Sequence, residues 1–510
     1  MIQGFPIVSR ATRVLVFSAL VLFIASVVLL GFAMALGMPA VAGGPMWSMS
    51  TKPAPDTVAV LQGVGMFVGA VAVGLGIAAV GTGWRPSPRL LVAIGAAVAA
   101  VYLFLPPSWG DTDVLNYAIY GRIAAPGHSP YLMTPEQLYR TGDPVGVLGP
   151  VAWRGWPTVY GPVATVLEWV AAELGRTSMA WIVFWIKAGN WIAFVLTAIG
   201  LVRLTAGNRA LQARSCILWA VNPLMLFWLV GNGHIDVLLA LAAVLLLTVL
   251  KSGRLNAISA GFLGGLIIGA GTAIKSPFLL AAIGVAWTVR RSPRTIFAGV
   301  IGAAAVLVPS YLQPGALDEA VLSRRLTWNP SFMHLPGAIT SRPDVYGALI
   351  LLATLVMAVI LLLRMPQGYQ ARPSVRPAAA LVLAYLLVFP TAGPWYDALI
   401  IPLVALIVPS WLDYLVTIQL ALLSEMALPT GIPHSAIYKT ERMVGIISHA
   451  GVLLVPIVLV VLCVRNSWSV SWPDGIGGGV PQPAVLASGT EVPAPNLPAP
   501  NLPGRHRAQR

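Results

Sequence analysis

Fourteen apolar runs, most of them near 20 residues long, alternate along the chain with short polar stretches. A helix of about 20 apolar residues crosses the ~30 Å hydrocarbon core of a bilayer, so we interpret the runs as membrane-spanning helices. They lie at 14–37, 57–80, 89–107, 180–202, 214–231, 235–250, 257–274, 276–289, 295–311, 345–364, 377–391, 396–410, 411–429 and 443–464. The pair 396–410 and 411–429 is short and marked by proline, so the pattern predicts 13 or 14 spans.

Lysine and arginine predict the orientation, because cytoplasmic loops carry an excess of these residues. With the N-terminus inside, the basic groups fall on the cytoplasmic side at every second loop. These groups are Arg10 and Arg13; Arg85 and Arg89; Arg203, Arg209 and Arg214; Lys251 and Arg254; Arg290, Arg291 and Arg294; Arg364, Arg372 and Arg376; and Arg465. Most acidic residues, which do not enter this assignment, fall on the opposite side. The pattern therefore predicts that the chemistry lies on the extracytoplasmic face.

The same pattern divides the chain into a membrane domain over 1–465 and a cytoplasmic tail over 466–510. The tail is rich in proline and glycine, which predicts disorder, and its basic end is suited to anionic lipid heads. Two outer loops, about 108–157 and 312–343, are long and rich in Trp, Tyr, Pro and Arg. The stretch 158–175 is amphipathic and is predicted to lie in the membrane interface.

Composition supports an all-α polytopic membrane protein. Only 9% of the 510 residues are charged and 57% are hydrophobic, whereas soluble domains carry about 25% charged residues. The net charge of +14 does not indicate a nucleic-acid partner, because the basic residues are dispersed between apolar runs instead of forming one stripe. Cys216 and Cys463 lie inside apolar runs and predict neither a disulfide nor a metal site.

The first outer loop holds the most informative motif, WGDTDVLNYAIYGR, from Trp109 to Arg122. If the motif is helical from its second aspartate, one face carries Asp113, Asn116, Tyr117 and Tyr120, and the other carries apolar residues. This arrangement predicts a short surface helix that presents a carboxylate, an amide and two phenols to a water-facing cleft. Asp113, with Asp111 just before it, is suited to act as a general base. Either aspartate is also suited to cap the helix.

Two further motifs place ionisable groups at predicted outer ends of spans. GNGHID contributes His234 and Asp236, which are suited to positioning a hydroxyl or binding a cation, or to a capped and solvated turn. These two ligands are too few to predict a metal. TAIKSP contributes Lys275, whose ammonium is suited to neutralising a phosphate or to snorkelling toward the interface.

For the other candidate substrate-binding residues, a purely structural role is also considered. In the second outer loop Arg324, Arg325 and His334 are candidates for phosphate binding, with a solvated loop as the alternative. Arg122 is a further candidate of the same kind. In the motif PWYD the aromatic belt accounts for Trp395, whereas Asp397 is harder to explain by position alone.

Five stretches together resemble a known enzyme family. They are GDTDVLNYAIYGR with GHSPY, PTVYGP, GNGHID, AIKSP and GPWY, within residues 90–430. In order and topology they resemble the GT-C glycosyltransferases, and more narrowly the actinobacterial polyprenol-phosphate-mannose-dependent alpha-(1->6)-mannosyltransferases. These motifs add His128 and Tyr160 to the candidate substrate-binding residues. Asn116 is a departure, since a small polar residue is expected there.

The resemblance implies an inverting transfer of mannose from a polyprenyl-phosphate donor to a glycolipid or polysaccharide acceptor of the cell envelope, on the outer face of a bacterial plasma membrane. One aspartate would be the general base, basic residues would stabilise the phosphate, and no cofactor or metal is expected. The chain also lacks the nucleotide-binding motifs of a soluble sugar donor, which favours a lipid-borne donor. The alternative function is a transporter or flippase of lipid-linked sugars, which matching inverted repeats would support.

Overall fold

Helices make up the protein, and the residues that the structure describes contain no β-strand. The computed structural model describes residues 9–49, 55–151, 153–317, 343–366, 375–388, 393–427 and 436–468. The predicted disordered tail and most of the second outer loop, including Arg324, Arg325 and His334, lie outside these residues.

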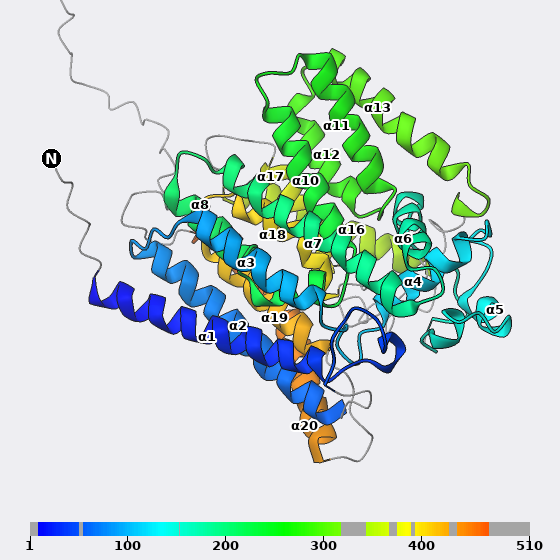
Figure 1. The fold of residues 1–510 in the computed structure, drawn as a ribbon. Coiled ribbons are helices and arrows are strands. Elements are labelled where there is room, and N and C mark those ends of the chain that lie inside the picture. The colour runs from blue at the N-terminus through cyan, green and yellow to red at the C-terminus, as the bar shows by residue number, and fades with distance from the viewer. Residues whose placement is uncertain are drawn as a thin grey trace, which may run out of the picture.

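The first half of the chain forms a bundle with a lateral group of short helices (Figure 1). The long helices α1 and α2 pack side by side, and α3 and α7 pack against each other. The elements are α1 Arg10–Ala35, η1 Pro39–Val41, α2 Pro55–Gly81, α3 Pro88–Leu103, α4 Asp113–Ala124, α5 Pro135–Arg140, η2 Gly146–Leu148, α6 Pro162–Gly175, α7 Met179–Leu204, α8 Arg209–Leu218, α9 Pro223–Met225, η3 Leu226–Gly231 and α10 Asp236–Lys251.

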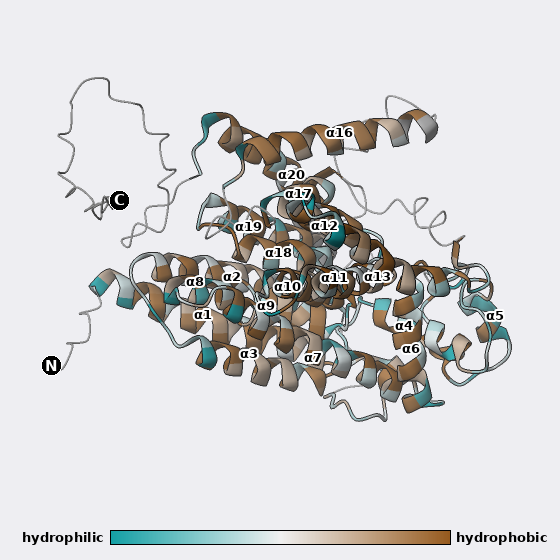
Figure 2. Cartoon of the chain, turned by 90° about the horizontal axis from the view of Figure 1, so that it is seen from above, coloured by the Kyte–Doolittle hydropathy of each residue, from teal (hydrophilic) through white to brown (hydrophobic). Residues whose placement is uncertain are grey.

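The second half adds helices around α10, with α11 packed closely on α13. Figure 2 shows the largely apolar α16 at the edge of the bundle. The elements are α11 Ala257–Thr272, α12 Phe278–Ala286, η4 Trp287–Val289, α13 Pro293–Tyr311, α16 Pro343–Arg364, α17 Val375–Val388, η7 Pro394–Tyr396, α18 Asp397–Ala405, α19 Trp411–Met426 and α20 Ala436–Arg465.

Every predicted apolar run is helical over most of its described residues, which confirms an all-α polytopic membrane protein. Among the described residues five helices are long and apolar enough to cross a membrane, or six when one bent pair counts as a span. Several further apolar helices are shorter, such as α3, α11 and α17, so the count of 13 or 14 spans stays a prediction. The run 214–231 differs from a straight span: it bends by 44° between α8 and α9, where Pro223 cannot continue the preceding helix.

The predicted surface helix forms, but its environment differs from the expectation. Helix α4 begins at Asp113 as predicted. Asn116, Tyr117 and Tyr120 are nevertheless as buried as the apolar residues on the opposite face, so they do not line an open water-facing cleft. The reason is that α6 and α7 cover α4, and α6 approaches so closely that a Cβ at Gly121 would meet the backbone of Glu168.

The interfacial helix predicted at 158–175 begins later, at Pro162, where α6 starts. Its Glu168 is buried against α4, and the side that it exposes is mainly apolar, with Leu167, Trp169 and Leu174 beside one exposed carboxylate, Glu173. An exposed apolar face with a tryptophan is suited to the membrane interface.

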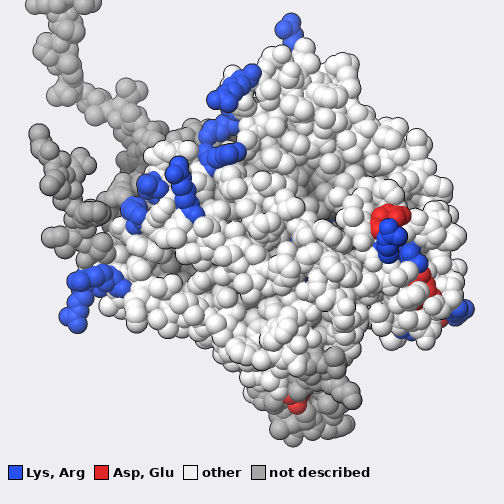
Figure 3. Space-filling view, in the orientation of Figure 1, with Lys and Arg blue, Asp and Glu red and all other residues white. Residues whose placement is uncertain are grey.

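Basic residues and the predicted chemistry lie at opposite ends of the same helices. Helix α3 begins beside Arg89 and runs toward Asp111, and α10 begins at Asp236 and ends at Lys251. In Figure 3 Lys and Arg line the end of the molecule where α1 begins, whereas Asp and Glu gather with a few basic residues around α4–α6. This distribution agrees with the orientation that the loops predict.

We predict that the 108–157 loop is extracytoplasmic. A cysteine replacing Val151, which is 78% exposed, should react with a membrane-impermeant thiol reagent in intact cells. A cysteine replacing Gly253, in the basic turn after α10, should react only after lysis; no heavy atom lies near enough to hinder it. The native Cys216 and Cys463 are buried and give little background. Labelling of the Gly253 variant alone in intact cells would reverse the orientation.

Candidate functional site

Three of the predicted groups meet where α3 ends and α4 begins. The Nε2 atom of His234 lies 2.7 Å from Oδ2 of Asp111, and its Nδ1 atom lies 3.8 Å from Oδ2 of Asp113. Asp111 also accepts a hydrogen bond of 3.3 Å from the backbone N–H of Asp113, at the start of α4. The N-cap of α4 is Thr112, so neither aspartate is the N-cap; Asp111 precedes it and accepts from the first N–H of the helix, and Asp113 is the first helical residue.

Hydrogen bonds of buried amide side chains hold together the loop that follows α3 and the GNGHID loop. The side-chain oxygen of Asn232 accepts a hydrogen bond of 2.7 Å from the backbone N–H of Ser108, and Gln62 donates to the Ser108 hydroxyl. From α7, the amide of Asn190 donates to the carbonyls of Leu229 and His234, at 3.0 Å each. The position of His234 is thus fixed from two sides by buried amides.

A second cluster forms around Lys275. Its ammonium donates to Oδ1 of Asp236 at 2.9 Å and lies 3.7 Å from the ring centroid of Tyr396 and 5.7 Å from that of Tyr160. Tyr160 in turn donates to the hydroxyl of Tyr117 at 3.3 Å. Lys275 therefore does not snorkel to the interface; it is held in an ion pair and a cation–π contact.

The motif that carries Tyr160 pairs directly with the motif that carries Lys275. The backbone N–H of Gly161 donates to the carbonyl of Ile274 at 3.0 Å, and that of Val163 donates to Ala273 at 2.9 Å. A Cβ at Gly161 would lie 2.6 Å from the carbonyl carbon of Ala273, so only glycine allows this approach. These contacts bring two stretches more than a hundred residues apart into one site.

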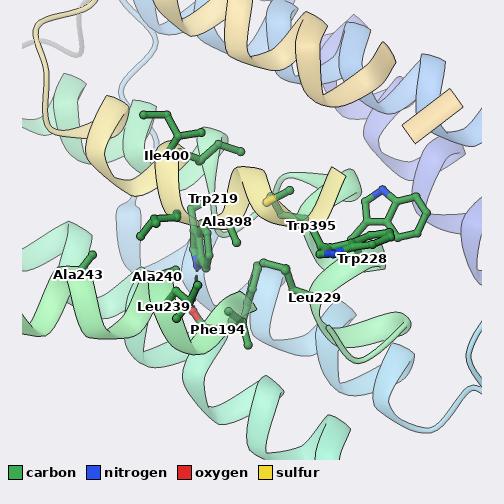
Figure 4. Close-up of a cluster of buried hydrophobic side chains, with 14 of the residues drawn as sticks. Phe194, Trp219, Trp228, Leu229, Leu239, Ala240, Ala243, Trp395, Ala398 and Ile400 are labelled. Carbon is green, nitrogen blue, oxygen red and sulfur yellow. Dashed lines mark hydrogen bonds between the residues drawn. The ribbon is translucent and has the colours of Figure 1, made fainter. Parts of the chain in front are cut away.

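Aromatic rings cover one side of the site. Trp395 stacks on His234, with ring centroids 3.8 Å apart and planes 10° apart. Trp228 lies against both rings and donates to the hydroxyl of Ser424 at 2.9 Å. Figure 4 shows Trp228 and Trp395 together at the margin of the buried apolar cluster. The stack limits how far the imidazole can move from the two aspartates.

The two clusters are close enough to influence each other's charge. Burial raises the pKa of Asp113 from 3.8 to about 6; the charge of His234 opposes this rise, and Asp111 adds to it. Burial by itself lowers the pKa of His234, but the charge and hydrogen bond of Asp111 outweigh it, so the net direction is upward. In the same way Asp236 outweighs the effect of burial on Lys275 and raises its pKa.

The remaining predicted residues lie apart from these clusters or have other partners. Arg122 forms an ion pair with Asp143 at 2.9 Å, which holds the pKa of that carboxyl below its ordinary value despite partial burial. The residue His128 is exposed after α4. Tyr120 donates to the carbonyl of Trp156 at 3.3 Å. Asp397 is fully buried in α18, and neither of its carboxylate oxygens has a hydrogen-bond partner in the described chain.

Several site residues were not among the predicted ones. Tyr396 follows Trp395 in PWYD, and its ring covers Lys275. Asn190 is a polar residue within the predicted span 180–202, and the structure shows that it fixes the His234 loop. Asn232 lies within GNGHID and Trp228 three residues before it, but neither residue was singled out from the sequence.

No group of three or more His, Cys, Asp or Glu side chains that could hold a metal ion occurs among the residues described. The site as described is instead an array of three carboxylates, one imidazole and one ammonium, enclosed by tyrosine and tryptophan rings. Such an array is suited to moving a proton beside a bound anion.

Comparison with known proteins identifies a family for more than half of the chain. The model for alpha-(1->6)-mannopyranosyltransferase, N-terminal domain, matches residues 13–291. This range includes Asp111, Asp113, His234, Asp236 and Lys275, and it excludes the aromatic residues of η7. No curated protein and no solved structure matches the chain.

We predict that Gly161→Ala separates the Tyr160 and Lys275 loops. Its methyl group would overlap the Ala273 carbonyl, and such overpacking costs about 1–3 kcal/mol. The melting temperature of the purified protein in detergent should fall. Gly155→Ala is the matched control, because no heavy atom of the described residues lies within 4 Å of its added Cβ. Equal melting temperatures for the two variants would contradict the proposed close approach.

Proposed function

We propose that this chain, which belongs to the alpha-(1->6)-mannopyranosyltransferase family, transfers mannose from a polyprenyl-phosphate donor to a glycolipid or polysaccharide of the cell envelope. The reaction would take place on the extracytoplasmic face of a bacterial plasma membrane. Family membership makes the protein an alpha-mannosyltransferase and favours an enzyme over a transporter. The observation that carries the finer proposal is a carboxylate with a pKa of about 6, Asp113, beside a buried ammonium, Lys275.

Asp113 is better suited than Asp111 to be the general base. Both oxygens of Asp111 are engaged, one with His234 and one with the N–H of Asp113. Asp113 accepts no hydrogen bond from a described residue, and its side chain is 21% exposed, against 8% for Asp111. An accessible carboxylate with free acceptor positions is what a general base needs in order to receive a substrate proton.

Lys275 is the group that we assign to the donor phosphate. An ammonium has three N–H donors, and Asp236 takes one of them. The side chain retains 11% exposure, so it can be reached, and the face of Tyr396 holds it in place. A fixed cation at this position would stabilise the negative charge that develops on the leaving phosphate.

The proposed reaction breaks one bond and forms one. The acceptor hydroxyl oxygen attacks the anomeric carbon of mannose while its proton passes to Asp113. The bond between that carbon and the phosphate oxygen breaks, and the electron pair leaves with polyprenyl phosphate. A single displacement inverts the anomeric carbon, so a β-linked donor gives an α product. The leaving group is already a stable anion, so this scheme requires neither a second carboxylic acid, unlike a glycosidase, nor a cofactor.

We expect Asp113→Asn to leave the protein folded but nearly inactive. The change is almost isosteric and keeps the polar first turn of α4, but an amide cannot accept the proton, and loss of a general base typically costs ~10²–10⁴-fold in rate. The measurement is mannose transfer from polyprenyl-phosphate mannose by purified protein. Asp111→Asn is the comparison and should retain more activity. If instead Asp113→Asn keeps more than about a tenth of the wild-type rate and Asp111→Asn abolishes it, the base is Asp111.

The raised pKa of Asp113 predicts the pH dependence of transfer. A general base works when it is deprotonated, so kcat/KM should rise with pH through about 6 and level off above it. Burial is the main cause of this value, and the charges of His234, Asp111, Lys275 and Asp236 modify it. A pH profile of the residual activity of Asp113→Asn should lack the limb near 6. An unchanged limb in that variant would assign the titration to another group.

A further inference from the structure

Only one of the two carboxylate oxygens of Asp236 accepts a hydrogen bond from a described residue. Its Oδ1 atom accepts from Lys275 at 2.9 Å, whereas its Oδ2 atom is buried and has no hydrogen-bond partner in the described part of the chain. The side chain is 1% exposed, and it begins α10, where the helix dipole favours a negative charge. Asp236 therefore has one carboxylate oxygen bonded to Lys275 and one unused acceptor oxygen inside the site.

An unused oxygen of this kind indicates the chemistry of its ligand. Buried polar groups in proteins are nearly always hydrogen-bonded, and leaving one unpaired costs roughly a factor of ten or more in an equilibrium. A carboxylate oxygen only accepts, so its ligand must donate. A phosphate is an anion and is repelled, whereas a sugar hydroxyl is a suitable donor.

We propose that Oδ2 of Asp236 accepts a hydrogen bond from the C2 hydroxyl of the donor mannose. The inference rests on the proposed function, in which Lys275 binds the donor phosphate. Because Oδ1 and Oδ2 share one carbon, a group on Oδ2 lies next to the group bound by Lys275. In a glycosyl phosphate the hydroxyl nearest the phosphate-bearing carbon is the one on C2.

This contact would make Asp236 a residue that determines specificity. Mannose and glucose differ only in the direction of the C2 hydroxyl, so an acceptor fixed in a rigid ion pair distinguishes them by geometry. A site built to bind a substrate hydroxyl rejects an analogue that lacks it, because the buried partner is then left unpaired. In glycosidases, hydrogen bonds to the 2-hydroxyl strengthen in the transition state. Loss of such a bond should therefore lower kcat/KM.

The test combines a change in the enzyme with a change in the donor. The full-length wild-type protein and Asp236→Ala are assayed with polyprenyl-phosphate mannose and with its 2-deoxy analogue, using one synthetic α-mannoside acceptor. The ratio of kcat/KM for the two donors should be about 10–100-fold larger in the wild type than in Asp236→Ala. Comparing ratios removes the intrinsic reactivity of the 2-deoxy donor, and also any loss that arises because Lys275 has lost its partner.

Two further variants make the result specific. Asp236→Asn keeps the shape of the side chain and a hydrogen bond to Lys275. Its ratio of kcat/KM for the two donors should also fall, because a hydrogen bond to a neutral amide oxygen is weaker than one to a carboxylate. This variant provides the test if Asp236→Ala does not fold. Asn116→Ala also removes a buried oxygen without a partner, but one not joined to Lys275, and its ratio should stay at the wild-type value.

Equal ratios in the wild type and the Asp236 variants, to within about twofold, would overturn the inference while mannose transfer itself remains. An equal fall in the ratio of kcat/KM for the two donors in Asn116→Ala would also overturn it, because recognition of the C2 hydroxyl would then not depend on Asp236. If the wild type transfers no sugar from polyprenyl-phosphate mannose, the proposed function fails, and the assignment of Asp236 fails with it.

Discussion

The site depends on an imbalance of buried charge. Three carboxylates, Asp111, Asp113 and Asp236, face two cations, His234 and Lys275. Asp111 and Asp236 each have a cation within hydrogen-bonding distance, and Asp113 does not. Buried charges are tolerated only when they are paired and hydrogen-bonded. Burial therefore raises the pKa of Asp113, which lacks such a close partner; the charge of His234 opposes this rise and that of Asp111 adds to it. A carboxylate that binds a proton near neutral pH is the consequence.

Rigid surroundings are needed to keep that imbalance in place. The imidazole of His234 is held by the stacked ring of Trp395, and the backbone of His234 is held by the amide of Asn190. Lys275 is held by Asp236 and Tyr396. The rings of η7 lie outside the range matched by the family domain. The C-terminal half of the chain therefore completes the enclosure of ionisable groups that the N-terminal half supplies.

The sequence allowed the helices and the main site residues to be predicted, but not their pairing. Apolar runs determine helices locally, and the motifs were recognisable because each combines polar residues with a predicted end of a span. The contact of His234 with Asp111 joins positions 123 residues apart, and packing of whole helices determines it. The burial of Tyr117 and the ion pair of Arg122 with Asp143 were unpredictable for the same reason. Lys275 left two alternatives open, and only its distance to Asp236 separates them.

The arrangement of charges also explains why the two clusters must be adjacent but distinct. In the proposed reaction Asp113 loses one negative charge when it takes the proton, and the leaving phosphate gains one. The total charge of the site is unchanged, while one unit of negative charge moves from the carboxylate without a close cation to the phosphate beside Lys275. Moving charge toward a preorganised cation lowers its energy, because the ammonium does not need to reorganise. If every carboxylate had its own close cation, the charge on the base would be stabilised before the reaction. No negative charge could then move from a less stabilised position to a more stabilised one.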